Sequence, residues 1–418
     1  MLLYRLFIYL YPLTARLMSI FSPKARRWCR GQQTAFSQIP KQPHNKKIIW
    51  MHCASMGEFE QGLPVLKQLK NQYPQFSILV SFFSPSGYEA CKNHSIADWV
   101  VYLPMDHPRK SAQWISEIHP ELVIFVKYEF WYYYLAALHQ QKIPVILISA
   151  IFRQHQLFFH WYGGFYRSML QFFKHILVQN EDSAALLKSI GILDGVTITG
   201  DTRFDRVLEI ARNPTHYPAI EHFIQHKPVL VIGSSWPEDD KELQYFVNHH
   251  PNIQMIIVPH HIDQDAIRQC KEIFPGAVCY SDFERDWQDS NQYKGINKLI
   301  INRMGMLSSL YKYATVAYVG GGFGAEGVHN VLEATIFGKP VVIGPEYSKY
   351  LEVTQLVEHG GVITVRTTQE LNNTLQNLFE NKEICSSTGK KANEFTITQT
   401  GATQKVMQVI QENRLLIN

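Results

Sequence analysis

The stretch from Gly320 to Pro345 reads GGGFGAEGVHNVLEATIFGKPVVIGP and follows an apolar run, Val316 to Val319. We expect a strand that runs into a glycine-rich loop, then a helix that Asn330 opens and Gly338 ends, then another strand. Glycines let a backbone approach a ligand closely, and a helix N-terminus offers unpaired N–H groups to a phosphate. Glu333, in the first turn of that helix, can accept hydrogen bonds from a ribose diol. The stretch therefore predicts a sugar-nucleotide site, although an ordinary glycine-rich turn would have the same pattern.

Length and composition set the broad class of protein. The chain has 418 residues, of which 46% are hydrophobic and 18% charged, enough for two domains with sizeable cores. A formal net charge of +4 is too small to indicate a nucleic-acid partner. The six cysteines are scattered without a CxxC pair, which favours a reduced compartment and argues against a zinc site.

The N-terminal segment, residues 1–30, is expected to associate with a membrane. Residues 1–21 are rich in Leu, Ile, Tyr and Phe, but Arg5, Pro12 and Arg16 interrupt them, so no uncharged span of 18 residues exists. A basic cluster follows, made of Lys24, Arg26, Arg27 and Arg30. Apolar residues beside basic ones suit insertion into one leaflet of an anionic membrane. The alternative is a helix that packs on the protein's own core.

Short apolar runs alternate with helical patterns along the rest of the chain, as in parallel sheets covered on both faces. The first series of expected strands is Ile48–His52, Phe76–Phe83, Trp99–Leu103, Leu122–Val126, Val145–Ser149, His175–Gln179 and Val196–Gly200. The second series is Val229–Gly233, Met255–Pro259, Lys298–Asn302, Thr315–Gly320, Pro340–Gly344 and Gly361–Val365.

Two such series predict an α/β protein with two doubly wound, Rossmann-like domains that face a cleft. The polar stretch between the series contains Pro214 and Pro218 and suits a linker. We therefore expect an acceptor-binding domain over residues 31–208, a linker over 209–226 and a nucleotide-sugar domain over 227–418, whose last helix may return to the first domain. Ligands bind beyond the carboxyl ends of parallel strands, so residues just after strands are the candidates for a site.

The first strand leads into HCASMGEFEQG, in which Ser55 and Gly57 make a turn and Glu58 stands near a helix start. An ionised carboxylate there can take a proton from an attacking hydroxyl. A carboxylate that only interacts with the helix dipole is the alternative. After the fourth strand, Glu129 and Trp131 suit a sugar acceptor, because rings stack on sugar faces and a carboxylate orients hydroxyls; a half-buried aromatic helix start would look the same.

Two arginines are candidates for anionic groups of the substrates. Arg153 begins an aromatic segment that could meet an anionic lipid head, and Arg203 could bind a phosphate or carboxylate through its planar fork. An ion pair of Arg203 with Asp201 or Asp205 is the alternative.

In the second domain, Ser234 and Ser235 follow a strand, where they can cap a helix and donate to a phosphate. His260 and His261 follow Pro259, but adjacent side chains at a strand end diverge, so a metal site there is not expected. The domain also lacks a DxD-like pair after a strand. The backbone of Met304, Gly305 and Met306 could contact a base.

The chain resembles the Kdo (3-deoxy-D-manno-octulosonic acid) transferases of lipopolysaccharide synthesis over nearly its whole length. The resemblance rests on the N-terminal segment and on HCASMGE, KYEFW, TGDTRFD, the VP-His-His strand end and GVHNVLEA.

The resemblance implies a GT-B fold, CMP-Kdo as donor, a lipid A precursor as acceptor, no cofactor, and a place on the cytoplasmic face of the inner membrane. It implies that Glu58 is the general base. CMP contacts would fall at Pro259 and His260, at Met304 to Met306, and at Asn330, Val331, Leu332 and Glu333.

Three positions depart from the common family pattern. Many members have Arg in place of His260, an acidic residue in place of Met306, and GHNPLE where this chain carries Val328 and no proline. Other readings of the whole chain are a transferase that uses a UDP-sugar, a UDP-sugar 2-epimerase, and a non-catalytic sugar-nucleotide binder.

Overall fold

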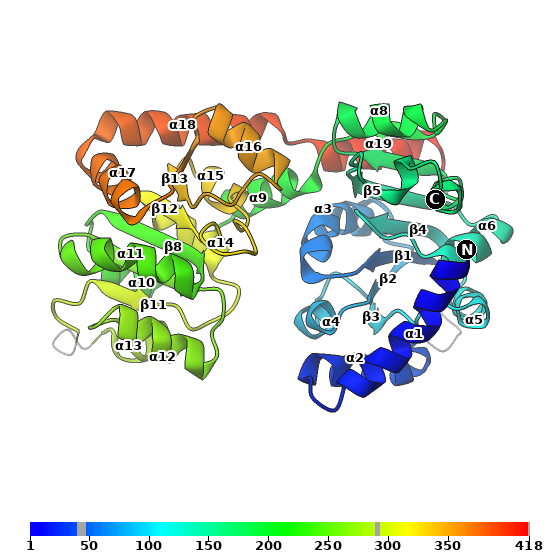
Figure 1. The fold of residues 1–418 in the computed structure, drawn as a ribbon, viewed down its shortest axis with the longest axis horizontal. Coiled ribbons are helices and arrows are strands. Elements are labelled where there is room, and N and C mark those ends of the chain that lie inside the picture. The colour runs from blue at the N-terminus through cyan, green and yellow to red at the C-terminus, as the bar shows by residue number, and fades with distance from the viewer. Residues whose placement is uncertain (40–46, 289–292, 417–418) are drawn as a thin grey trace. The chain divides into compact units, whose positions relative to one another are not determined.

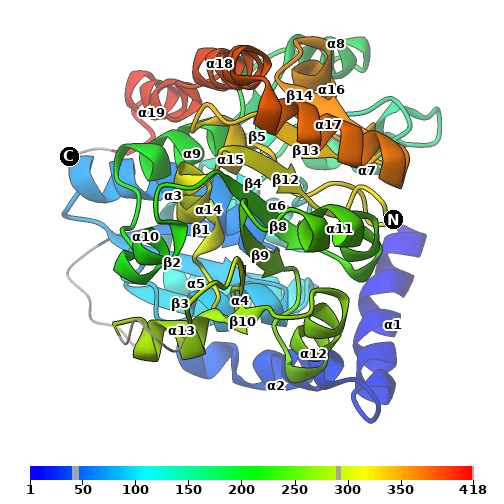
Figure 2. The same ribbon diagram turned by 90° about the vertical axis from the view of Figure 1, so that its left-hand side faces the viewer.

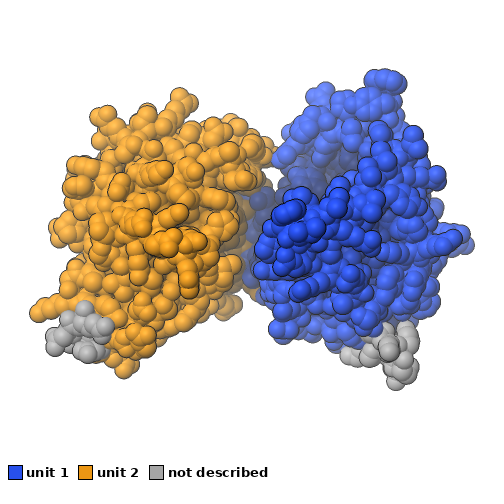
Figure 3. Space-filling model, turned by 60° about the horizontal axis from the view of Figure 1, so that its bottom comes forward, with its two compact units in different colours: residues 1–206, 400–418 blue, residues 207–399 orange. Residues whose placement is uncertain are grey.

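The computed structural model of the protein describes residues 1–39, 47–288 and 293–416. The chain forms two compact units, one of residues 1–206 and 400–418 and one of residues 207–399 (Figure 3). The division falls inside helix α9 (Thr202–Arg212), and the segment expected as a linker also holds helix α10 (Pro218–Ile224).

The first unit is built on a seven-stranded parallel sheet with strand order β3-β2-β1-β4-β5-β6-β7 (Figure 1). Its strands are β1 Ile48–Cys53, β2 Ser77–Phe82, β3 Trp99–Tyr102, β4 Pro120–Val126, β5 Val145–Ala150, β6 His175–Val178 and β7 Val196–Ile198. The strand order reverses between β1 and β4, so the residues that follow these two strands lie at a topological switch point.

Helices cover both faces of this sheet. Its helices are α1 Leu2–Met18, α2 Pro23–Thr34, α3 Met56–Gln72, α4 Pro85–Cys91, α5 Pro108–Ile118, α6 Tyr132–Gln140, α7 Gly164–Leu170, α8 Glu181–Ser189 and α19 Ala402–Glu412. Alternate residues of β1 point to opposite faces: Ile49 packs with α3 and α19, whereas Trp50 packs with α5 and α6. The final helix α19 therefore completes the core of the first unit, beside α3.

The second unit has a seven-stranded parallel sheet with strand order β10-β11-β9-β8-β12-β13-β14 (Figure 2). Its strands are β8 Val229–Ser235, β9 Gln254–Pro259, β10 Val278–Cys279, β11 Lys298–Ile300, β12 Val316–Val319, β13 Val341–Ile343 and β14 Val362–Thr364. Its switch point lies between β8 and β12. The sequence did not predict β10, because two residues are too few to show a pattern.

The helices of the second unit are, after α10, α11 Pro237–His249, α12 Gln264–Ile273, α13 Tyr280–Asp286, α14 Leu307–Leu310, α15 Leu332–Thr335, α16 Leu351–Glu358, α17 Thr368–Glu380 and α18 Lys382–Thr398. Leu230 and Ile232 of β8 join a core with α11, α12 and α17. The expected helix from Asn330 to Gly338 is shorter in the structure. Only Leu332–Thr335 is α-helical, because the N–H groups of Phe337 and Gly338 donate to carbonyl oxygens three residues earlier, those of Ala334 and Thr335, which makes tighter turns. The chain then turns at Gly338, whose φ of 68° lies in the left-handed region.

Helix α1 packs one face on the first unit and leaves the other exposed. Tyr4 and Ile8 are buried, and the Tyr4 hydroxyl donates to Asp106 Oδ2 at 2.5 Å. The exposed face is apolar, with Leu2, Leu3, Leu6, Phe7, Leu10, Leu13 and Leu17. No helix within the described ranges is both long enough and apolar enough to span a bilayer.

Candidate functional site

Glu58 lies beyond the carboxyl end of β1, in the first turn of α3, where local sequence fixes its carboxylate. Ser55 is the N-cap and accepts a hydrogen bond from the Glu58 N–H, while Glu58 Oε2 accepts from the N–H groups of Ala54 and Ser55. This is a capping box. Among the described residues, both hydrogen bonds to the carboxylate use Oε2, so Oε1 remains to accept a proton.

The environment of Glu58 raises the pKa of its carboxyl group to about 8. Burial is the largest cause, and the negative charge of Glu129 adds to it; the N–H groups of Ala54 and Ser55 and the charge of Lys127 oppose the rise. A carboxylate tuned toward neutral pH is a suitable general base. The capping role that the sequence left as an alternative and a proton-accepting role are thus compatible in one side chain.

Glu129 follows β4, on the other side of the switch point, and is almost fully buried. Its Oε2 accepts a hydrogen bond from Trp131 Nε1 at 2.5 Å and lies 3.0 Å from His52 Nε2. The other ring nitrogen of His52 lies 3.1 Å from the carbonyl oxygen of Ser81 and 2.9 Å from its hydroxyl. Glu129 is therefore held in place by His52 of the neighbouring strand β1 and by Trp131 of its own loop.

The other acceptor-side candidates lie in the same unit but have different surroundings. Gly57 is exposed at the start of α3. Arg153 follows β5 and is exposed. Arg203 forms the ion pair with Asp201 that the sequence left open, at 2.7 Å. Burial alone would raise the pKa of the Asp201 carboxyl group. The charge of Arg203 and the hydrogen bonds from Arg203 and Gln61 outweigh this effect and hold the pKa below its usual value.

In the second unit, aromatic side chains that follow three strands form a stacked group that we call the histidine–tryptophan platform: Trp236, His260 and His329. Trp236 Nε1 donates to His329 Nε2 at 2.8 Å, and the two rings are parallel within 2°. The His260 ring stacks with both, at centroid distances of 4.5 Å. Burial, together with the neighbouring His329 and His261, lowers the pKa of His260 to about 4, so this side chain is neutral at pH 7.

Asp239 links the loop after β8 to the loop after β12, at the switch point of the second unit. Its carboxylate accepts hydrogen bonds from the N–H groups of Trp236 at 2.9 Å and Gly321 at 2.7 Å, and from the Tyr318 hydroxyl at 2.7 Å. A Cβ atom at Gly320 would lie 2.6 Å from the Ser234 carbonyl oxygen. The close approach of these backbones therefore requires glycine at position 320.

Ser234 and Ser235 end β8 and do not cap the next helix, contrary to the expectation. Pro237 occupies the first position of α11, so the N-cap is Trp236, and the carboxylate of Asp239 satisfies its N–H. The Ser235 side chain is buried.

The remaining donor-side candidates differ in what they can offer a ligand. Asn330 and Glu333 are linked by a 3.1 Å hydrogen bond from Asn330 Nδ2 to Glu333 Oε1. Four candidates have buried side chains, which limits them to backbone contacts: Pro259, Met306, Val331 and Leu332. Met304 is 76% exposed, and Gly305 has a φ of 80°.

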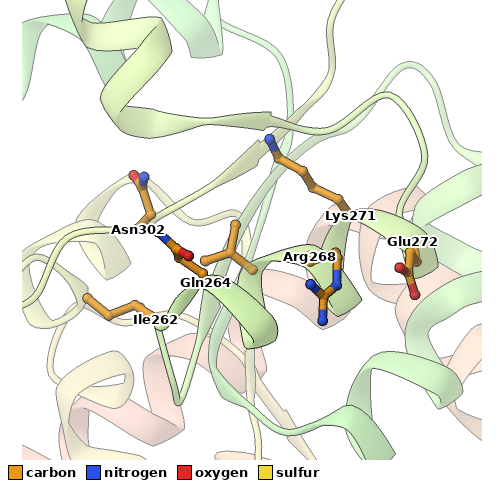
Figure 4. A pocket seen from close by; sticks show the side chains of 7 residues that line it. Ile262, Gln264, Arg268, Lys271, Glu272 and Asn302 are labelled. Carbon is orange, nitrogen blue, oxygen red and sulfur yellow. The ribbon is translucent and has the colours of Figure 1, made fainter.

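A cavity of about 500 Å³ lies beside α12 in the same unit (Figure 4). Its lining mixes apolar, polar and charged side chains and comprises Ile262, Gln264, Ile267, Arg268, Lys271, Glu272 and Asn302. None of the predicted donor-side residues lines it. Within the described part of the chain, no three His, Cys, Asp or Glu side chains are grouped as metal ligands.

Sequence reasoning missed four residues of these sites: His52, Trp236, Asp239 and His329. His52 and His329 lie inside quoted motifs, and Trp236 and Asp239 lie just after Ser235, but their roles depend on hydrogen bonds and ring stacking between segments of different strands. Only His52, near the end of β1, and Trp236, directly after β8, have positions that could have indicated a site.

Comparison with solved structures supports the GT-B fold. The chain matches UDP-GlcNAc 2-epimerase from Neisseria meningitidis with a TM-score of 0.61 and 15% identity, covering 88% of this chain and all of that one. It matches MurG from Acinetobacter baumannii with a TM-score of 0.51 and 14% identity, covering 88% of this chain and 99% of that one. At these identities the matches concern the fold alone. They confirm the expected class, a pair of Rossmann-like domains of GT-B type.

Sequence comparison finds relatives in the family that the sequence resembles. Residues 29–206 match the family described as 3-deoxy-D-manno-octulosonic-acid transferase (kdotransferase). The chain is 25% identical over 415 residues to the 3-deoxy-D-manno-octulosonic acid transferase of Haemophilus influenzae, covering 94% of this chain and 93% of that one. It is 26% identical over 346 residues to that of Aquifex aeolicus, covering 81% and 88%. The resemblance to the Kdo transferase family is thus confirmed, and these relatives place the chain among the glycosyltransferases.

Proposed function

We propose that this protein transfers Kdo from CMP-Kdo to a lipid A precursor, lipid IVA, during lipopolysaccharide synthesis. The observation that carries the proposal is Glu58: a carboxyl group at the switch point of the first unit, with a pKa of about 8 and one oxygen available to a substrate. The relatives that match most of the chain are named as transferases of this sugar.

Glu58 acts as the general base of an inverting transfer. In its ionised form it takes the proton from a hydroxyl of the acceptor sugar while that oxygen forms a bond to the anomeric carbon of Kdo. The bond from this carbon to the phosphate oxygen breaks, and CMP leaves from the opposite face of the sugar. A phosphate monoester leaves readily, so one carboxylate suffices, unlike the two that most glycosidases use.

The second unit binds the CMP part of the donor at its own switch point. The backbone N–H groups of Asn330 and Val331 suit a phosphate, and Glu333 suits the ribose diol. Neutral His260 contributes a ring surface rather than a positive charge, because its pKa is lowered to about 4. The Arg-to-His departure from the common family pattern therefore changes the type of contact at this position.

The first unit binds the acceptor and lies on the cytoplasmic face of the inner membrane. Two features support this localisation: the apolar outer face of α1 and the exposed basic residues that follow it, Lys24, Arg26, Arg27 and Arg30. Each basic residue near an anionic surface adds about 1 kcal/mol to membrane binding. Glu129, held by His52 and Trp131, is positioned to orient acceptor hydroxyls.

Nucleotide binding and CMP release test this function against transfer from a UDP-sugar. We expect calorimetry to show tighter binding of CMP than of UMP or UDP, and we expect Glu333→Ala to weaken CMP binding. Freshly generated CMP-Kdo should release CMP rapidly only when the lipid A precursor is added. Tighter binding of UDP than of CMP would contradict the proposal. A rate of CMP release that does not change when the precursor is added would also contradict it.

A further inference from the structure

An apolar cavity of about 390 Å³ lies in the first unit, where α1 and α2 meet the loop after β2. Residues Tyr11, Thr14, Ala15 and Met18 of α1 line it at the spacing of a single helix face. Ala25 and Trp28 of α2 and Phe83 and Pro85 after β2 complete its walls, and Ser22, Lys24 and Ser84 supply polar groups.

The cavity is connected to the acceptor-side carboxylates through aromatic contacts. The ring of Phe83 lies 4.8 Å from that of Trp131, and Trp131 Nε1 donates to Glu129 Oε2. The sheet order explains this proximity. Strands β2, β1 and β4 are neighbours, so Phe83, Glu58 and Glu129 follow the carboxyl ends of three adjacent strands.

We propose that this cavity binds one fatty acyl chain of the glycolipid acceptor. The inference rests on the proposed function, because it assumes that the acceptor is a lipid. Its apolar walls suit a hydrocarbon chain, and its volume is within the range of ligand pockets. Its place next to Trp131 lets a single molecule put an acyl chain in the cavity and a sugar hydroxyl at Glu58.

Two polar features match the head of an acylated sugar. The Trp28 indole N–H is buried and has no hydrogen-bond partner among the described residues. A carbonyl at the start of an acyl chain would supply the missing acceptor. The exposed Lys24 ammonium provides a positive charge for a phosphate on the lipid.

Alanine-to-leucine substitutions can fill the cavity without weakening the helices, since both residues are strong helix formers. Ala15→Leu and Ala25→Leu place added volume in the cavity. Ala112→Leu is the matched control, because Ala112 lies exposed on α5 in the same unit and does not line the cavity. Thermal unfolding of all three variants shows whether the fold is intact.

The test uses a 12-carbon fatty acid with a terminal diazirine as a probe, followed by mapping of cross-links by mass spectrometry. We expect labelling within residues 11–28 and 83–85 of the wild type, reduced about tenfold by Ala15→Leu and Ala25→Leu but not by Ala112→Leu. The same two variants should raise the KM for the acylated acceptor about tenfold and leave the KM for a fully deacylated acceptor unchanged.

The inference would be overturned if labelling were confined to the outer face of α1 and if Ala15→Leu and Ala25→Leu behaved as the wild type. This result would leave the proposed function standing. Cavity labelling that the filled variants abolish, in a protein that transfers sugar to neither acceptor, would support the acyl site and remove the proposed function. Equal use of acylated and deacylated acceptors by the wild type would also overturn the inference.

Discussion

The imidazole of His52 lies 3.0 Å from the carboxylate of Glu129, and both side chains are buried at the carboxyl ends of neighbouring strands. Trp131 donates to the same carboxylate oxygen, so Glu129 has little freedom to move. From this fixed position its negative charge raises the pKa of Glu58. In the proposed mechanism the two carboxylates have different roles: Glu129 raises the pKa of Glu58 and orients the acceptor, and Glu58 takes the proton.

Glu58→Gln should abolish most of the transfer while leaving the donor site intact. Glutamine keeps the shape of the side chain and its capping role but cannot accept the acceptor's proton at neutral pH. We expect the transfer rate to fall by about 10²–10⁴-fold, with CMP affinity unchanged in calorimetry. Near-normal turnover would show that another group is the base.

The pH dependence of transfer should follow the ionisation of Glu58. Only the ionised carboxylate can accept a proton, so kcat/KM should rise with pH through about 8, the raised pKa of Glu58. Glu129→Gln removes a negative charge that favours the protonated form, so the midpoint should move to lower pH.

Glu60→Gln is the matched control for this shift. Glu60 is also a carboxylate of α3, but it pairs with Arg206 at 2.6 Å and is not among the main causes of the raised pKa of Glu58. Its substitution should leave the midpoint where it is in the wild type. A midpoint that moves equally in both variants would argue against a specific role for Glu129.

Gly320→Ala should damage the nucleotide site of the second unit. The added methyl group would meet the Ser234 carbonyl oxygen at 2.6 Å and force the two switch-point loops apart. We expect CMP binding at least tenfold weaker and a lower melting temperature. Gly324→Ala is the control, because its Cβ would meet only one atom, at an ordinary 3.7 Å; equal losses in both variants would contradict this account.

Membrane association should depend on the exposed face of α1. Replacing Leu2, Leu3 and Leu6 with Gln leaves the buried contacts of Tyr4 and Ile8 in place, so the helix should remain packed. We expect the variant to lose most of its binding to vesicles that contain anionic lipids. Co-sedimentation equal to that of the wild type would contradict a role for this face.

Sequence patterns predicted both sheets, because buried parallel strands are continuous apolar runs that need no tertiary information to detect. They failed for the two-residue strand Val278–Cys279 and for the length of the helix after Asn330, where tighter turns replace α-helical hydrogen bonds after Thr335. The position of Glu58 in the first turn of a helix after a strand was predictable from the sequence, and its catalytic role stays a prediction. The partners His52 and Ser81 were not, because their contacts join strands that are far apart in sequence.

The most direct test of the central claim is mass spectrometry of a tetraacylated lipid A precursor after incubation with the purified protein and freshly generated CMP-Kdo. The account predicts a gain of one or more Kdo masses, which Glu58→Gln should prevent. No gain, in a protein that retains its fold and still binds CMP, would contradict the proposed acceptor. No gain together with no CMP binding would contradict the proposed function as a whole.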